Sequence, residues 1–98
     1  MTIKYTTNAK EDFQYSLEYY KNESITLANN FKADIKASIN RIKSFPHLYP
    51  TAEFNSKIQK CIVSKFPFTL YYTILNDTIF ILAVANHYKN PKYFEERF

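Results

Sequence analysis

A set of cationic, imidazole and phenolic side chains in the second half of the sequence could act on RNA. Cleavage of RNA needs a group that accepts the proton of the 2′-hydroxyl, and cations that stabilise the charge developing on the phosphate. An imidazole titrates near neutral pH, so His87 could accept that proton, although a structural role at the end of a strand is the simpler interpretation. The groups available for this chemistry are Lys57, Lys60, Lys65, His87, Lys89, Tyr93 and Arg97.

The same region could bind a macromolecule, which requires fewer precisely placed groups than catalysis does. Lys57, Lys60 and Lys65 fall on one predicted strand and its approach, and Lys89 and Lys92 follow in the tail. Aromatic rings mixed with cations suit a protein interface or the stacking of nucleic-acid bases. The aromatic residues of the tail are Tyr88, Tyr93, Phe94 and Phe98. The last two could instead pack the tail onto the sheet.

Several other kinds of site are excluded by what the sequence lacks. It contains no glycine, so it cannot form a glycine-rich phosphate loop. One cysteine and two histidines supply neither a disulfide framework nor a zinc cluster. We therefore expect no metal and no cofactor, and we interpret Cys61 as a small apolar residue of a strand in a reducing, cytoplasmic environment.

Length and charge set further bounds. The 98 residues fit a single domain, residues 1–98, and a hydrophobic content of 46% argues against disorder. Residues 1–56 carry seven basic and six acidic groups, whereas residues 57–98 carry six basic and three acidic groups. The surplus of positive charge in residues 57–98 favours an acidic protein or nucleic acid as partner.

No apolar run follows Met1 or approaches the roughly 20 residues that span a bilayer, so we expect no signal peptide and no membrane partner.

The first half of the sequence predicts a strand and a helical hairpin that would support these groups. Residues 2–6 alternate as a strand does, and Asn8 with Glu11 is typical of a helix start, which predicts a helix over 9–22. Ser24 can cap a second helix that Pro46 ends near residue 44 or 45. Its apolar face recurs every three or four residues, at Leu27 or Ala28, Phe31, Ile35, Ile39 and Ile42.

The second half predicts three strands, over residues 57–65, 68–75 and 78–85, after a polar loop at 51–56. Asn76 and Asp77 favour a tight hairpin turn between the last two strands. The last strand is apolar on both of its faces, which predicts a central position covered on both sides. Pro91 is expected to break any regular element in the tail. The fold class is therefore α+β, in the order β-α-α-β-β-β, with the helical hairpin packed on an antiparallel sheet.

The order of elements and several short motifs resemble the RelE/ParE toxin superfamily over nearly the whole chain. The segment Lys65–Tyr72 is similar to the aromatic-Pro-aromatic strand start of these toxins, and 76–84 is similar to their final hairpin. The run from Ala85 to Pro91 is similar to the closing His, basic residue and Pro of ParE-type members. Phe45-Pro46 with Pro50 matches the family's usual exit from the second helix.

The resemblance implies the toxin of a type II toxin–antitoxin (plasmid stabilisation) system, a growth inhibitor neutralised by a cognate antitoxin. ParE-type members bind DNA gyrase without cutting RNA, and the long hairpin and His-Pro tail favour that branch. The alternatives are a RelE-type, ribosome-dependent mRNA endonuclease and a degenerate toxin that retains only antitoxin binding. The family usually places arginine where Gln59 and Lys60 stand, and lysine does not replace its two-pronged hydrogen bonding.

Two sets of candidate residues follow, one for each kind of activity. If the chain is a nuclease, the resemblance and the chemistry together indicate Lys60, His87, Tyr93 and Arg97 as catalytic residues. Enzymatic activity is the less favoured interpretation, because a tail is a poor platform for Tyr93 and Arg97. If the chain acts by binding, the contact residues are expected to be Lys57, Gln59, Lys60, Lys65, His87, Lys89 and Lys92.

Overall fold

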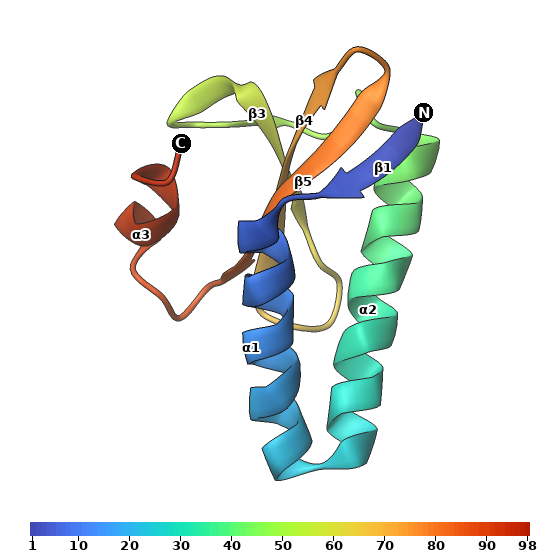
Figure 1. Ribbon diagram of the computed structural model, residues 1–98, viewed down its shortest axis with the longest axis vertical. Helices are drawn as coiled ribbons and strands as arrows, with labels where there is room; N and C mark the ends of the chain where they lie inside the picture. The colour runs from blue at the N-terminus through green and yellow to red at the C-terminus, as the bar shows by residue number, and fades with distance from the viewer.

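The computed structural model describes all residues, 1–98, and shows two long helices packed against a five-stranded sheet (Figure 1). The elements in chain order are β1 (Thr2–Tyr5), α1 (Thr7–Glu23), α2 (Ile25–Ser44), β2 (Thr51–Ala52), β3 (Asn55–Ile62), β4 (Phe68–Leu75), β5 (Thr78–Asn86) and α3 (Pro91–Glu95). The predicted α+β class and the helical hairpin are confirmed. No helix combines the length and apolar composition that crossing a membrane requires.

The sheet is mixed, with the strand order β1-β5-β4-β3-β2. Strands β2 to β5 pair antiparallel, as predicted, whereas β1 pairs in parallel with β5 and so occupies the far edge. The short strand β2 lies in the segment that was predicted to be a polar loop, and β3 begins and ends earlier than residues 57–65. The turn between β4 and β5 is confirmed, because Asn76 and Asp77 both adopt positive φ angles, of 48° and 64°.

Both long helices begin at a side-chain cap. Thr6 caps α1, since its Oγ1 accepts a hydrogen bond from the Ala9 N–H at 3.1 Å; α1 therefore starts two residues before the position that Asn8 and Glu11 predicted. Ser24 caps α2 as expected, accepting from the Leu27 N–H at 3.2 Å, while its own N–H donates to the Tyr20 carbonyl and closes α1. One residue thus ends the first helix and starts the second, which makes the hairpin tight.

The main core lies between the helical hairpin and the sheet. The predicted apolar face of α2 is confirmed, with Phe31 and Ile42 fully buried. Phe31 packs against Phe68 of β4 with ring centroids 4.9 Å apart, and Tyr20 of α1 packs against Phe66 at 5.1 Å. These aromatic contacts join both helices to the start of β4.

A bulge at Leu82 reverses the alternation of side chains along β5. Residues of odd number face the helices before the bulge, and residues of even number face them after it. Tyr72 pairs with Ile81 and Tyr71 pairs with Ala83, so Leu82 has no partner of its own in β4. Before the bulge Ile79 and Ile81 face the helical hairpin; after it Val84 does, while Ala83 and Ala85 face the other side. The bulge thus changes which residues face the helices after Leu82, and the predicted central position of the strand is confirmed.

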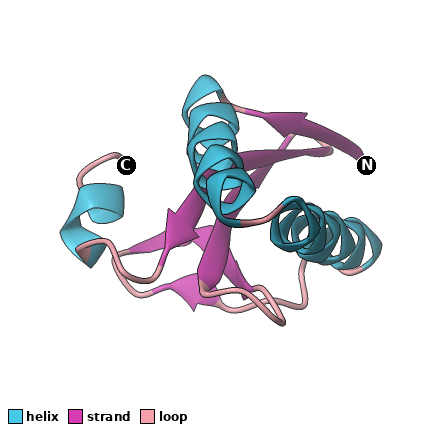
Figure 2. Cartoon of the chain, turned by 90° about the horizontal axis from the view of Figure 1, so that it is seen from below, coloured by secondary structure: helices cyan, strands magenta, loops and turns pink.

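Part of the far face of the sheet is covered by α3, in a tail that was predicted to lack regular structure. Pro91 begins this helix instead of preventing one, because the first helical position needs no N–H donor, and Asn90 caps it through the Lys92 N–H at 3.0 Å. Phe94 is buried against Ala83 and Ala85. In Figures 1 and 2, α3 lies apart from the hairpin, on the opposite side of α1 from α2.

A buried carboxylate on α2 holds the loop between β3 and β4. Asp34 is 6% exposed, and its Oδ2 accepts hydrogen bonds from the backbone N–H groups of Lys65 and Phe66, both at 2.9 Å. This contact fixes the loop against the middle of α2, so that Phe66 reaches the aromatic cluster.

We expect Asp34→Ala to destabilise the fold by about 2–3 kcal/mol, because it leaves two backbone donors without an acceptor. Asp34→Asn should cost less, since its amide oxygen can still accept. Urea unfolding followed by circular dichroism measures both, with Glu18→Ala on the exposed face of α1 as the control. Equal stability of Asp34→Ala and the control would contradict this role.

Candidate interaction surface

The side chain of Gln59 forms hydrogen bonds within the fold and is not part of the open surface. It stands opposite Tyr72, on the side of the sheet that faces the helices. Its Nε2 donates to the carbonyls of Pro46 at 2.9 Å and Tyr49 at 3.1 Å. The Tyr72 hydroxyl donates to the same Pro46 carbonyl at 2.6 Å, and burial raises the pKa of this phenol, which keeps it protonated. Together the two side chains hold the connector that follows α2.

The three lysines of the predicted basic strand lie on different surfaces. Lys57 is exposed on β3. Lys60 stands opposite Tyr71, on the face that α3 covers, and its Nζ lies 3.9 Å from a carboxylate oxygen of Glu53. Lys65 lies beyond the end of β3, in the loop that Asp34 holds against α2. A single continuous basic strand surface is therefore absent.

His87 lies just after β5 and is held from two directions. Its backbone N–H donates to the Pro67 carbonyl at 2.9 Å, and its Nε2 lies 2.7 Å from the Oγ1 of the buried Thr69. The direction of the proton in the second contact depends on the tautomer of the ring. These contacts match the structural role considered for this histidine, because they fasten the end of β5 to the start of β4.

Arg97 and Asp12 form an ion pair that fastens the end of the chain to α1. The guanidinium donates to both carboxylate oxygens, at 2.8 and 2.9 Å, and the two side chains are only 12% and 11% exposed. Hydrogen bonding to Asp12 raises the pKa of Arg97 above its ordinary value. Asp12 also accepts from the Val84 N–H at 3.0 Å, next to the bulge of β5. The tail is thus docked, and its arginine charge is already neutralised.

Tyr93 and Lys89 belong to the same docked segment. The Lys89 Nζ lies 4.3 Å from the centre of the Tyr93 ring and 5.6 Å from that of Tyr15 on α1. The Arg97 guanidinium carbon lies 5.3 Å from the Tyr93 ring. Around this cluster three tyrosines remain largely exposed: Tyr15 by 72%, Tyr19 by 60% and Tyr88 by 86%. Lys92 is exposed on α3.

The candidate nuclease residues do not form one constellation. A hollow between α1, β5 and α3 contains Tyr93, Arg97 and Lys89, but neither Lys60 nor His87. Transition-state stabilisation would need an uncompensated cation beside the phosphate, whereas Arg97 is paired with Asp12. The geometry of this region suits stabilisation of the tail and presentation of an aromatic surface.

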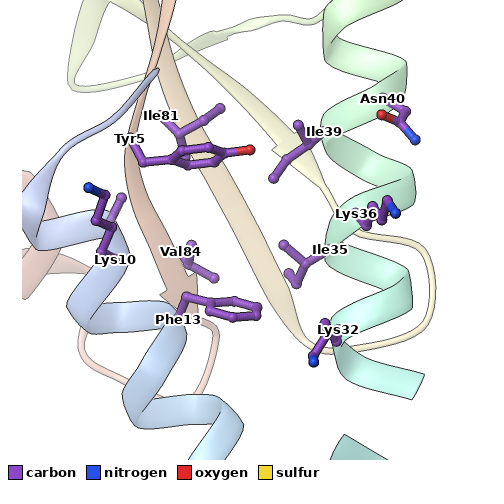
Figure 3. Close-up of a pocket in the computed structure, with 11 residues that line it drawn as sticks. Tyr5, Lys10, Phe13, Lys32, Ile35, Lys36, Ile39, Asn40, Ile81 and Val84 are labelled. Carbon is purple, nitrogen blue, oxygen red and sulfur yellow. The ribbon is translucent and has the colours of Figure 1, made fainter. Parts of the chain in front are cut away.

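A groove between the two long helices was not predicted from the sequence. Its floor combines apolar side chains of both helices and β5, with a volume of about 390 Å³. Figure 3 shows Phe13, Ile35 and Val84 directed into it. The rim is basic, with Lys10 on α1 and Lys32 and Lys36 on α2. The only sequence signal for the groove was the position of these lysines beside the apolar face of each helix.

Comparisons with known proteins give a family from the sequence and a similar fold from a solved structure. A family model described as the ParE toxin of the type II toxin–antitoxin system, parDE, matches residues 3–91. A solved structure described as the chromosomal ParDE TA system from P. aeruginosa is similar in fold, with a TM-score of 0.72 and 19% sequence identity. That likeness covers 88% of this chain and 95% of the other. None of the curated protein sequences matches the chain significantly.

We expect Asp12→Ala and Arg97→Ala each to destabilise the protein by roughly 3 kcal/mol, because each leaves its partner as an unpaired, largely buried charge. The double variant should cost clearly less than the sum of the two. Urea unfolding of the two single variants and the double variant measures this coupling. Glu53→Ala, which removes the exposed partner of Lys60, is the control and should change stability by about 0.5 kcal/mol or less. Strictly additive costs would show that the pair is not coupled.

Proposed function

Because the chain belongs to the ParE toxin family of type II toxin–antitoxin systems, we propose that it is a growth inhibitor neutralised by a cognate antitoxin and that, when free, it acts by binding DNA gyrase. The family match over residues 3–91 carries this proposal. The structure adds two surfaces that suit protein partners, the groove between α1 and α2 and the tyrosine surface around Lys89.

The groove supports the antitoxin part of the proposal. An amphipathic helix buries its apolar side in a hydrophobic groove of this kind, and acidic residues beside that side would meet Lys10, Lys32 and Lys36. The apolar floor supplies binding energy through Phe13, Ile39 and neighbouring residues, and the basic rim selects acidic flanks. The antitoxin is therefore proposed to insert an acidic amphipathic segment between the two helices.

The tyrosine surface supports the gyrase part. Tyrosine is enriched among the residues that dominate protein–protein binding. Tyr15, which lies against Lys89, is largely exposed, as are Tyr19 and Tyr88. Lys57, Lys65 and Lys92 are exposed and remain proposed contacts of the target. Binding is favoured over RNA cleavage because Arg97 and His87, two of the four candidate catalytic residues, are engaged within the fold, and the four do not lie together.

Induced expression in a bacterial host should stop growth with DNA breaks and an SOS response, while mRNA stays intact. The purified chain should also inhibit supercoiling by gyrase in the absence of ribosomes. Reporter induction, DNA integrity and mRNA cleavage are scored in the same cultures. Rapid arrest of translation with mRNA cut within codons would replace gyrase by the ribosome as target. The absence of any growth effect would indicate a degenerate toxin.

The charge reversals Lys32→Glu and Lys36→Glu, combined, should weaken antitoxin binding at least about tenfold, chiefly through slower association. The probe is the small protein encoded by the reading frame that adjoins the toxin gene, and calorimetry measures its affinity. The control is Lys4→Glu with Lys21→Glu, two exposed lysines outside the groove with the same change in charge. An equal loss in the control pair, or no loss in either, would place the antitoxin elsewhere.

A further inference from the structure

The exposed surface of α2 carries positive charge without any exposed negative charge. Its four cations, Lys32, Lys36, Arg41 and Lys43, are all exposed. Its single acidic residue, Asp34, is buried and bound to the backbone of the β3–β4 loop. The helix α1, by contrast, carries four acidic residues and two lysines. The basic face of the molecule is therefore α2.

A second hollow lies on the flank of α2 that faces away from the groove. It is formed by Asn30, Ala33, Ala37 and Arg41 of the helix together with Ser64, Lys65 and Phe66 of the loop. The groove is lined by a different set of α2 residues, including Lys32, Ile35 and Lys36. The polar side chains that line the hollow are an amide, a hydroxyl, an ammonium and a guanidinium, all of which can donate hydrogen bonds. The only carboxylate, that of Asp34, is already occupied by two backbone N–H groups.

These donors match the chemistry of a phosphate backbone. Lysine, arginine, serine and asparagine side chains make most protein contacts to phosphate oxygens in nucleic-acid complexes. Arg41 is exposed and donates to the Ser38 hydroxyl at 2.9 Å, which steadies its guanidinium at the edge of the hollow. The small side chains of Ala33 and Ala37 leave room for a backbone to approach the helix closely.

The hollow suits an acidic protein or a single-stranded nucleic acid less well than a duplex. Protein interfaces depend on large apolar or aromatic anchors, yet the only large hydrophobic residue that lines the hollow is Phe66. The exposed residues Phe45 and Ile62 lie nearby in the chain but outside this lining. Single-stranded nucleic acid binds by stacking its bases on exposed aromatic rings, and the one ring that lines the hollow is not fully available for this. Phe66 is only partly exposed, because it packs against Tyr20 and Phe31.

We propose that this flank of α2 binds the sugar–phosphate backbone of duplex DNA, without regard to base sequence, through Arg41 and Lys65 with Asn30 and Ser64. This site goes beyond the proposed function, because it requires neither gyrase nor the antitoxin. It lies on the other side of α2 from the groove, so a toxin with an occupied groove keeps the DNA site open. A toxin that binds an enzyme acting on DNA would then contact the DNA as well.

Fluorescence anisotropy with a short labelled duplex and the purified full chain tests the site. Binding should weaken between about 50 and about 200 mM salt, with a slope of log affinity against log salt of roughly −2 for two cations. The variant Arg41→Gln with Lys65→Gln should lower affinity about tenfold at low salt and reduce the slope by about 2. The matched control, Lys4→Gln with Lys21→Gln, removes the same net charge from β1 and α1 and should bind as the parent does. Thermal unfolding checks that both variants fold.

Four outcomes would overturn this proposal. They are the absence of salt-dependent binding, an equal loss in the control variant, tighter binding of a single strand than of the duplex, and competition by polyglutamate as effective as by the duplex itself. The last result would indicate an acidic protein as the partner. Gyrase inhibition is measured separately on the unaltered chain, because Lys65 is also a proposed contact of the target. Failure of DNA binding then leaves the proposed toxin activity standing, and failure of gyrase inhibition leaves the DNA result standing.

Discussion

One carboxylate, that of Asp12, connects the parts of this fold that are most distant in the sequence. It accepts the N–H of Val84 beside the bulge in β5 and both arms of the Arg97 guanidinium, so α1, the central strand and the end of the chain meet at one ion pair. The bulge needs such support because it removes a residue from the regular pairing with β4. Thr6 and Arg97 both donate to the Leu82 carbonyl, which completes the hydrogen bonding there. The bulge shifts the alternation of β5 by one residue, so that Val84 faces the helices while Ala83 and Ala85 face α3.

This arrangement decides which polar residues remain available for partners. Arg97 is bound in the ion pair with Asp12, and Gln59 is hydrogen-bonded to the connector after α2. His87 contacts Thr69 where β5 ends beside the start of β4. Arg97 and His87 were candidates for catalysis and Gln59 for binding, but each forms its hydrogen bonds within the molecule. The surfaces left open are of a different kind: an apolar groove with a basic rim, a group of exposed tyrosines beside Lys89, and the cationic flank of α2. All three suit recognition of macromolecules better than bond cleavage.

The charge exposed on each element of the fold differs from the charge counted along the sequence. Counting along the sequence assigns the positive surplus to residues 57–98, yet there Arg97 is paired with Asp12 and Lys60 lies near Glu53. The cations of α2 come from the half with the smaller surplus, and they dominate a surface because Asp34 is buried under the loop. The same carboxylate therefore stabilises the loop and leaves the basic helix without an exposed acid.

The sequence by itself determined the features that depend on neighbouring residues: the apolar period of α2, the capping of α2 by Ser24, the turn at Asn76 and Asp77, and the motifs typical of the family. Only the tertiary structure decided the parallel pairing of β1, the bulge at Leu82, the docking of α3 and the pairing of Arg97 with Asp12, 85 residues away. The physical reason is that these features depend on which distant groups meet. A helix cap or an apolar repeat is recorded in adjacent residues, whereas the partner of a buried charge, or the gap between two helices, exists only once the elements have packed.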